Sequence, residues 1–204
     1  MLIFWDQRLV FLATPKAGST AIEVALEPLA SLAVQHPPQM KHADIAHFQR
    51  HLHPWLREMT DDHFTTVALM REPVEWLRSW YRFELRDSTE GAAAVPSGGF
   101  EDFVSRYLDD PRALTQGIGT QAAFLTADGC AVDRIFRYEE IGTFTRFLDE
   151  WLDCGISLPR VNVPPSADVS LSAQTEAQLR EALAPDFALY GMISPDSPQA
   201  GPDI

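Results

Sequence analysis

The sequence predicts an α/β fold in which a central, mainly parallel sheet is flanked by helices. Two apolar runs of strand length, residues 9–13 and 64–70, are each followed by a helical pattern of apolar residues. A third run, "DRIFRY" at residues 133–138, also precedes an amphipathic helix. Strands that alternate with helices favour a parallel sheet, because each helix carries the chain back across a face of that sheet.

Proline residues define several element limits in the first part of the chain. Pro28 and Pro54 are expected to stop helices, whereas Pro73 suits the first turn of one. The expected elements are a strand at 9–13, a helix from 19 or 20 to 28, a loop at 35–40, a helix at 43–52, a strand at 64–70 and a helix at 73–86.

The second part is expected to complete a single domain that spans residues 1–194. The stretch at 88–99, "STEGAAAVPSGG", has the composition of a mobile loop. Residues 195–204 resemble a frayed tail, because they hold prolines, a glycine and no apolar period. The other expected elements are helices at 100–108, 141–152 and 174–184, a strand at 133–138 and a Pro-rich loop at 158–170.

Composition and charge exclude several classes of protein. The 204 residues carry a net charge of −13, and most of it lies in the second half. Residues 1–87 have 9 basic and 11 acidic side chains, whereas residues 88–204 have 7 and 18. Binding to nucleic acid or to a polyanionic polysaccharide is therefore disfavoured, and an anion is expected only in a local pocket of the first half.

The sequence lacks signals for a membrane span, a leader peptide or a zinc site. No apolar run approaches membrane length, and the N-terminus leads directly into the first expected strand. The two cysteines, Cys130 and Cys154, are not part of a metal-binding spacing, and no metal is expected. We therefore expect a soluble protein of a reducing, cytoplasmic compartment.

The turn "TPKAGST" at residues 14–20 is the first candidate anion site. Gly18 can adopt backbone angles that let the loop wrap round an anion, with peptide N–H groups at the start of the next helix pointing inward. Lys16 adds a full charge, and Ser19 and Thr20 add hydroxyls. The alternative is a plain strand–helix turn in which Ser19 or Thr20 caps the helix.

A second candidate site repeats this arrangement in "VALMREPVEWLRSWYR", residues 67–82. Arg71 follows a buried strand at its carboxyl end, where open α/β sheets bind ligands, and Ser79 lies eight residues later on the next helix. The alternative is a solvated pair of Arg71 and Glu72. Two cationic strand ends that both open helices predict a ligand with two separated phosphates.

At these motifs the chain resembles the sulfotransferases that use 3′-phosphoadenosine-5′-phosphosulfate (PAPS). "PKAGST" is similar to their 5′-phosphosulfate loop, "REPVEWLRSWYR" to their 3′-phosphate segment, and "MKHADI" to the Lys/His segment between the two. The resemblance covers most of residues 9–190 and implies a three-layer, P-loop-like fold. Later segments that are also similar are "TQAAFL", "VDRIFRYEEI" and "LPRVN".

The resemblance assigns expected roles to individual residues. Arg71 and Ser79 would bind the 3′-phosphate of the donor. The residues that would bind the 5′-phosphosulfate are Lys16, Ala17, Gly18, Ser19 and Thr20. The Arg-Lys-Gly segment that completes the 3′-phosphate site in many family members is not visible here. The candidates to replace it are Arg78, Arg134, Arg137 and Arg160.

Sulfuryl transfer needs a group that stabilises the leaving oxygen and a base that takes the acceptor's proton. Lys16 fits the first role, and His42 fits the second because imidazole titrates near neutral pH. Lys41 would lower the pKa of His42 or contact a substrate. His47 and Glu23 remain alternative bases.

Several aromatic and polar residues have no single predicted role. Trp76 and Trp80 are expected in the core rather than on an adenine ring. Gln121 and Tyr138 would either line the cleft or belong to the core or surface.

The sequence predicts a sulfotransferase that moves a sulfuryl group from PAPS to a hydroxyl or amine, releasing 3′-phosphoadenosine 5′-phosphate (PAP). A P-loop kinase or NTPase is the first alternative, but Lys16 precedes Gly18, whereas that motif needs Lys after Gly. A PAP-binding protein without turnover is the second. The expected acceptor is a small molecule, a lipid-like alcohol, an amine or a neutral glycan, and the oligomeric state stays open.

Overall fold

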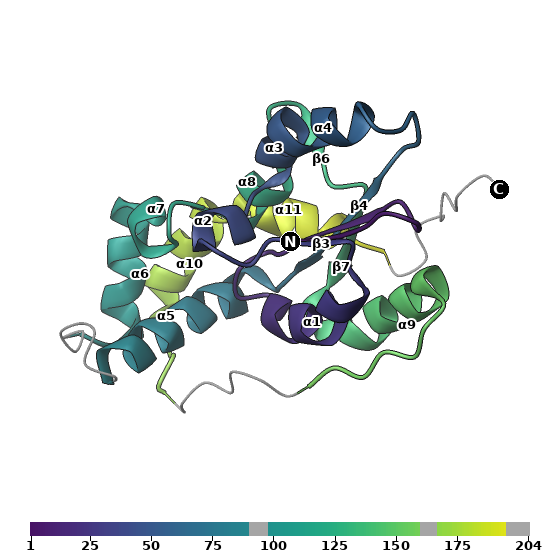
Figure 1. Ribbon diagram of the computed structural model, residues 1–204. Helices are drawn as coiled ribbons and strands as arrows, with labels where there is room; N and C mark the ends of the chain where they lie inside the picture. Colours follow the sequence, from purple (N-terminus) through teal and green to yellow (C-terminus); the bar gives the residue numbers. More distant parts are fainter. Residues whose placement is uncertain (90–97, 160–166, 195–204) are drawn as a thin grey trace.

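The computed structural model describes residues 1–89, 98–159 and 167–194. Its main sheet has five strands, and Figure 1 shows helices against both faces. In spatial order the strands are β3 (Leu32–Ala33), β1 (Leu2–Phe4), β2 (Leu9–Leu12), β4 (Thr65–Met70) and β7 (Arg134–Arg137).

The sheet is mixed, with a parallel and an antiparallel part. β2, β4 and β7 run parallel, as the sequence predicts, with Leu12 opposite Ala68 and Met70 opposite Arg137. β1 pairs antiparallel with both β2 and β3. These two strands were not expected, because runs of three and two residues are too short to show a strand pattern.

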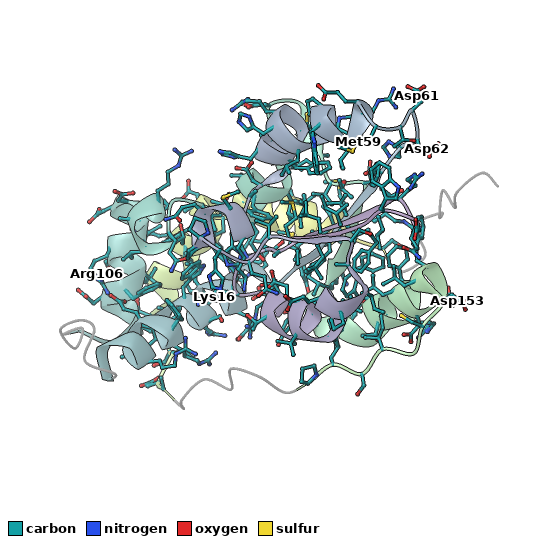
Figure 2. All side chains as sticks on the ribbon, viewed as in Figure 1. Lys16, Met59, Asp61, Asp62, Arg106 and Asp153 are labelled. Atoms are coloured by element: carbon teal, nitrogen blue, oxygen red, sulfur yellow. The ribbon has the colours of Figure 1, made fainter. Side chains whose placement is uncertain are left out.

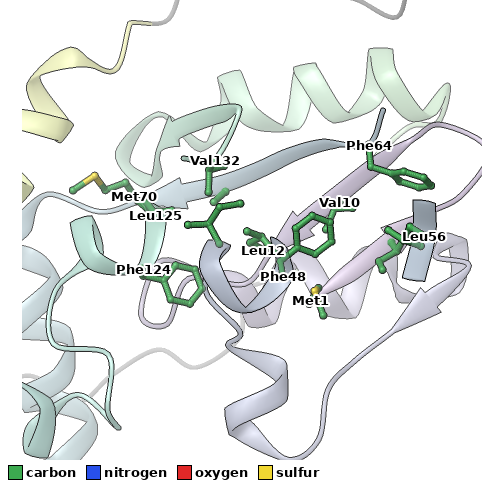
Figure 3. Packing of buried hydrophobic residues seen from close by; sticks show 13 residues of the cluster. Met1, Val10, Leu12, Phe48, Leu56, Phe64, Met70, Phe124, Leu125 and Val132 are labelled. Carbon is green, nitrogen blue, oxygen red and sulfur yellow. The ribbon is translucent and has the colours of Figure 1, made fainter. Parts of the chain in front are cut away.

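The two faces of the sheet hold separate hydrophobic clusters. Successive residues of one strand point to opposite faces, so Val10 and Leu12 pack in one cluster while Leu9 and Phe11 pack in the other. Figure 3 shows the first cluster, where these strand residues meet α3 (Ile45–His47), η2 (Phe48–Leu52), α4 (His53–Arg57) and α8 (Gln121–Leu125). The second face is covered by α1 (Ser19–Leu26) and α9 (Ile141–Leu152).

A third cluster lies beside the sheet and is built mainly from helix residues. It joins α5 (Pro73–Thr89), α6 (Gly99–Asp109), α10 (Ala173–Ala182) and α11 (Ala184–Met192). The expected helix at 174–184 corresponds to α10, whereas α11, which begins after Leu183, was not predicted. α5 carries Trp76 and Trp80 into this cluster, so both tryptophans are buried as expected.

Two sequence predictions between residues 35 and 57 are wrong. Residues 38–40 of the expected loop belong to the short helix α2 (Pro38–Lys41). The expected helix at 43–52 does not stop before Pro54, because α3 (Ile45–His47) continues through the π-helix η2 (Phe48–Leu52) into α4 (His53–Arg57). Pro54 is accommodated because it lies in the first turn of α4, where a backbone N–H is not required.

The expected mobile loop at 88–99 is shorter at both ends than predicted. Ser88 and Thr89 are the last residues of α5, and Gly99 begins α6. Residues 90–97 of that loop, and the whole expected tail at 195–204, lie outside the described residues.

The remaining elements are short. They are η1 (Glu27–Leu29), α7 (Pro111–Leu114), α8 (Gln121–Leu125), β5 (Thr126–Ala127), β6 (Cys130–Ala131) and η3 (Tyr138–Glu140). Of the helices in the described ranges, none is both long enough and apolar enough to cross a membrane.

Candidate functional site

The loop between β2 and α1 has the backbone that an anion cradle needs. Gly18 is the N-cap of α1 with φ 79°, and in the described part of the chain no side chain caps that helix. A Cβ atom at Gly18 would lie 2.6 Å from Cε2 of Tyr138. Glycine is therefore required by the left-handed backbone and by the close approach of the tyrosine ring.

Two residues of the second motif donate hydrogen bonds to backbone carbonyl groups of this loop. The indole N–H of Trp76 donates to the carbonyl of Pro15 over 2.9 Å, and Nη1 of Arg71 donates to the carbonyl of Lys16 over 3.3 Å. Two of the loop's carbonyl groups are thus bound on the side of α5. Ala17 and Ser19 are buried, whereas Thr20 is partly exposed.

Lys16 itself has a left-handed backbone, with φ 61°. Its ammonium lies against α5, 3.1 Å from the ring centroid of Phe83 and 4.7 Å from that of Trp80. Figure 2 labels this lysine where the loop meets α5. The faces of these two aromatic rings therefore help to position the cation.

Arg71 lies at the carboxyl end of β4, next to this loop. Its guanidinium stacks on the ring of Tyr138 at 4.9 Å, and its Nη2 is 3.8 Å from a carboxylate oxygen of Glu75. Its Nε is buried and has no hydrogen-bond partner among the described residues. A partly exposed guanidinium with an unused donor is well suited to an incoming anion.

Three arginines gather around Glu75 on one side of α5. Nη1 of Arg78 is 2.6 Å from a Glu75 carboxylate oxygen, and Nη1 of Arg82 is 3.9 Å from the other. Ser79, one turn beyond Glu75, is partly exposed. This group extends the positive charge of Arg71 toward Ser79.

The other arginine candidates lie elsewhere. Arg134 is at the opposite end of β7, opposite Val67, where its guanidinium stacks on Phe147. Arg137 is at the correct end of β7, but it contacts the carboxylate of Glu140 and the backbone carbonyl of Tyr190. Arg160 lies outside the described residues.

His42 is attached to the strand that leads into the loop. Its Nδ1 is 2.6 Å from the carbonyl oxygen of Ala13. A carbonyl only accepts, so Nδ1 carries the proton and the neutral ring keeps a lone pair on Nε2. Burial lowers the pKa of His42, the Ala13 hydrogen bond opposes this shift, and the charge of Lys41 lowers the pKa further. The structure thus gives His42 the tautomer of a base.

The alternative bases are engaged in other contacts. Glu23 is buried, and its two carboxylate oxygens contact the ammonium of Lys41 at 2.7 Å and the amino group of Met1 at 3.1 Å. His47 is exposed and bonded to Asp44 at the start of α3. No group of three metal-ligating side chains is found among the residues that the structure describes.

Several residues of the site were not assigned a definite role from sequence. Tyr138 contacts both Gly18 and Arg71, and Gln121 bonds the backbone of Arg71. Phe83 contacts the ammonium of Lys16, and Glu75 contacts the guanidinium of Arg71. In the sequence these four residues look like ordinary core or surface residues. Only their contacts with distant segments of the folded chain show that they belong to the site.

One comparison with known proteins identifies the family. A family model described as "Sulfotransferase family" matches residues 1–181. The chain belongs to the sulfotransferase family. No curated protein and no solved structure gives a significant match. Membership supports a transferase activity on sulfuryl groups, and in this sulfotransferase the matched range includes both anion motifs and His42.

Proposed function

We propose that this protein transfers a sulfuryl group from PAPS to a hydroxyl or amine acceptor by in-line displacement. The observation that carries the proposal is the junction of the two motifs, where Arg71 donates to the carbonyl of Lys16. Two cationic strand ends therefore meet at one edge of the sheet, as a donor with separated 5′ and 3′ phosphates requires. Residues 1–194 would act as one P-loop-like domain.

The residues of the first motif fit the 5′-phosphosulfate. The backbone of Lys16 to Thr20 surrounds an uncapped helix N-terminus, which favours negative charge. The backbone N–H groups of Ala17, Gly18 and Ser19 belong to this proposed binding loop. Any side chain at Gly18 would enter the space that Tyr138 fills.

The residues of the second motif fit the 3′-phosphate. Arg71 brings a buried donor that is unused within the described residues, and Ser79 adds a hydroxyl on the same helix face as Glu75. Arg78 is our choice to complete this half of the site, since it shares Glu75 with Arg71, whereas Arg134 is at the far end of its strand.

PAPS supplies an activated sulfuryl group, and the chain supplies positioning and proton transfer. Nε2 of His42 takes the proton from the acceptor as the acceptor's oxygen or nitrogen bonds to sulfur. The bond between sulfur and the bridging oxygen breaks at the same time, and the electron pair stays on the 5′-phosphate of PAP. The ammonium of Lys16 stabilises that charge. No step requires a metal ion.

The acceptor is expected to be weakly charged or neutral. Residues 88–204 carry a net charge of −11, which repels highly sulfated polymers. A small molecule, a lipid-like alcohol, an amine or a neutral glycan remains the proposed class.

The donor is tested by comparing PAP with ATP in a thermal-shift assay. We expect PAP to raise the melting temperature and ATP to have little effect. Arg71→Ala is expected to abolish the PAP shift, and Arg78→Ala to reduce it. Arg134→Ala serves as the matched control, because it removes an arginine from the other end of the neighbouring strand. Stabilisation by ATP alone would favour the NTPase alternative.

Turnover is tested with labelled PAPS and a panel of acceptors. Lys16→Ala and His42→Ala are expected to lose sulfate transfer while the fold remains intact. PAP binding without transfer to any acceptor would favour a non-catalytic PAP-binding protein.

A further inference from the structure

The backbone of Arg71 is held by one side chain from a distant part of the chain. The N–H of Arg71 donates to Oε1 of Gln121 over 2.9 Å, and Nε2 of Gln121 donates to the carbonyl of Arg71 over 2.8 Å. Gln121 is fully buried. Its amide therefore pairs with Arg71 as a neighbouring strand would, just where β4 ends at Met70.

Gln121 is itself fixed by two further contacts. It is the first residue of α8, which Thr120 caps by accepting a hydrogen bond from the N–H of Ala123. The N–H of Gln121 donates over 2.9 Å to Oδ1 of Asp186, a fully buried carboxylate of α11. The contacts thus run from α11 through α8 to the end of β4.

We propose that Gln121 is a positioning residue for the 3′-phosphate half of the donor site. Its amide fixes the peptide groups on both sides of the Arg71 Cα, and so fixes the direction in which the guanidinium leaves the strand. This inference rests on the proposed function, since it assumes that Arg71 binds the 3′-phosphate. Asp186 supports Gln121 in turn, which makes α11 part of the donor-binding structure.

The amide is the group that this position requires. It offers a donor and an acceptor in one plane, which matches the carbonyl and N–H of a single residue. An apolar side chain of equal length leaves both backbone groups without a partner. A carboxylate still accepts the hydrogen bond from the Arg71 N–H. Its second oxygen cannot donate to the Arg71 carbonyl, so that contact is lost. Gln121→Met and Gln121→Glu therefore remove two contacts and one contact, respectively.

The experiment compares PAP with 5′-AMP, which lacks the 3′-phosphate, by calorimetric titration of the full chain. For Gln121→Met we expect PAP affinity to fall about tenfold or more, because a charge-assisted contact is misdirected. Affinity for 5′-AMP should change less than about threefold, since that ligand does not use Arg71. Gln121→Glu should give a smaller loss in the same direction, and it supplies the result if Gln121→Met does not fold.

A double-mutant cycle with Arg71→Ala separates positioning from general damage. In the Arg71→Ala background, Gln121→Met should have little further effect on PAP affinity. Thr66→Val is the matched control, because Thr66 is buried on the same strand and bonds Asp133 near the strand's other end. It should lower stability but keep the ratio of PAP to 5′-AMP affinity.

Two outcomes overturn the inference, and a third overturns its premise. Equal losses of PAP and 5′-AMP affinity in the Gln121 variants would reduce Gln121 to a structural residue. Unchanged affinity for both ligands would exclude any positioning role. If instead folded Arg71→Ala binds PAP as the parent protein does, the proposed 3′-phosphate site itself is wrong.

Discussion

At the scale of single residues, the proposed proton transfer depends on which nitrogen of His42 carries the proton. The Nδ1–H group of His42 donates a hydrogen bond to the carbonyl of Ala13, and Ala13 directly precedes the anion loop. The strand that ends in the cradle therefore also sets the tautomer of the proposed base. Burial keeps this ring neutral, because a charged imidazole would lose its hydration.

The acid limb of the pH–rate profile tests this arrangement. The base works only when neutral, and burial lowers the pKa of His42 below its ordinary value of 6.5. We expect kcat/KM to stay high as the pH falls to 6.5 and to decline only below it. Lys41→Met should move the decline to higher pH, because it removes a charge that lowers this pKa and leaves Glu23, which raises it.

Arg50→Met is the control for that variant, since Arg50 is an exposed cation paired with Asp128 and is not one of the charges that shift the pKa of His42. Its profile should match that of the parent protein. Coinciding profiles for Lys41→Met and the parent, or full activity in His42→Ala, would assign the base to another residue.

At the scale of elements, the anion loop depends on close packing between α1 and the segment after β7. Gly18 has φ 79°, and the ring of Tyr138 fills the space where a side chain would lie. Gly18→Ala is therefore expected to destabilise the fold by about 1–3 kcal/mol, the sum of a backbone cost near 1 kcal/mol and a steric clash. PAP binding should weaken as well, because the cradle opens.

Gly129→Ala is the matched control, because Gly129 has φ 77° and nothing lies within 4 Å of its Cβ position. It should show only the backbone cost of about 1 kcal/mol in urea unfolding. Adding Tyr138→Ala should recover part of the loss in Gly18→Ala. Equal unfolding free energies for the two glycine variants would show that the Tyr138 ring moves aside for a Cβ atom without lowering stability.

The elements that sequence predicts well are those whose signals are local. The strands at β2 and β4 and the helices α1 and α5 follow from an apolar run, a turn residue and a helical period within about twenty residues. The prediction that Pro54 ends a helix is wrong because a π-turn precedes it and changes which N–H groups need partners.

In the candidate site, too, residues with a local sequence signal could be predicted and residues defined by distant contacts could not. Lys16 and Gly18 are recognisable because they lie in the turn after β2, and Arg71 because it directly follows β4; the structure brings the two segments together. Gln121 lies 50 residues from Arg71 along the chain, and its amide resembles any other buried glutamine until the partner is known. No period or spacing within one segment encodes such a contact.

At the scale of the whole molecule, Asp186 connects the helical cluster to the sheet and does so as a buried acid. Burial raises its pKa from 3.8 to about 6, although hydrogen bonds from the N–H groups of Gln121 and Ala122 oppose the shift. The folded state therefore binds this proton more tightly than the unfolded state does. Stability contributed by Asp186 must rise as the pH falls from about 6 toward 3.8, and it is lost above pH 6.

This sign distinguishes Asp186 from an ordinary ion-paired acid, whose protonation destabilises the fold. A shift of about two units corresponds to roughly 3 kcal/mol, so the difference in unfolding free energy between the parent and Asp186→Asn should change by up to that amount from pH 7 to pH 4. Urea unfolding of both proteins across this range measures it. Glu176→Gln, an exposed acid paired with Arg180 on α10, should keep a nearly constant difference. Parallel curves for the parent and Asp186→Asn would mean that the pKa of Asp186 is the same in the folded and unfolded states, so that the fold stabilises its buried carboxylate as well as water does.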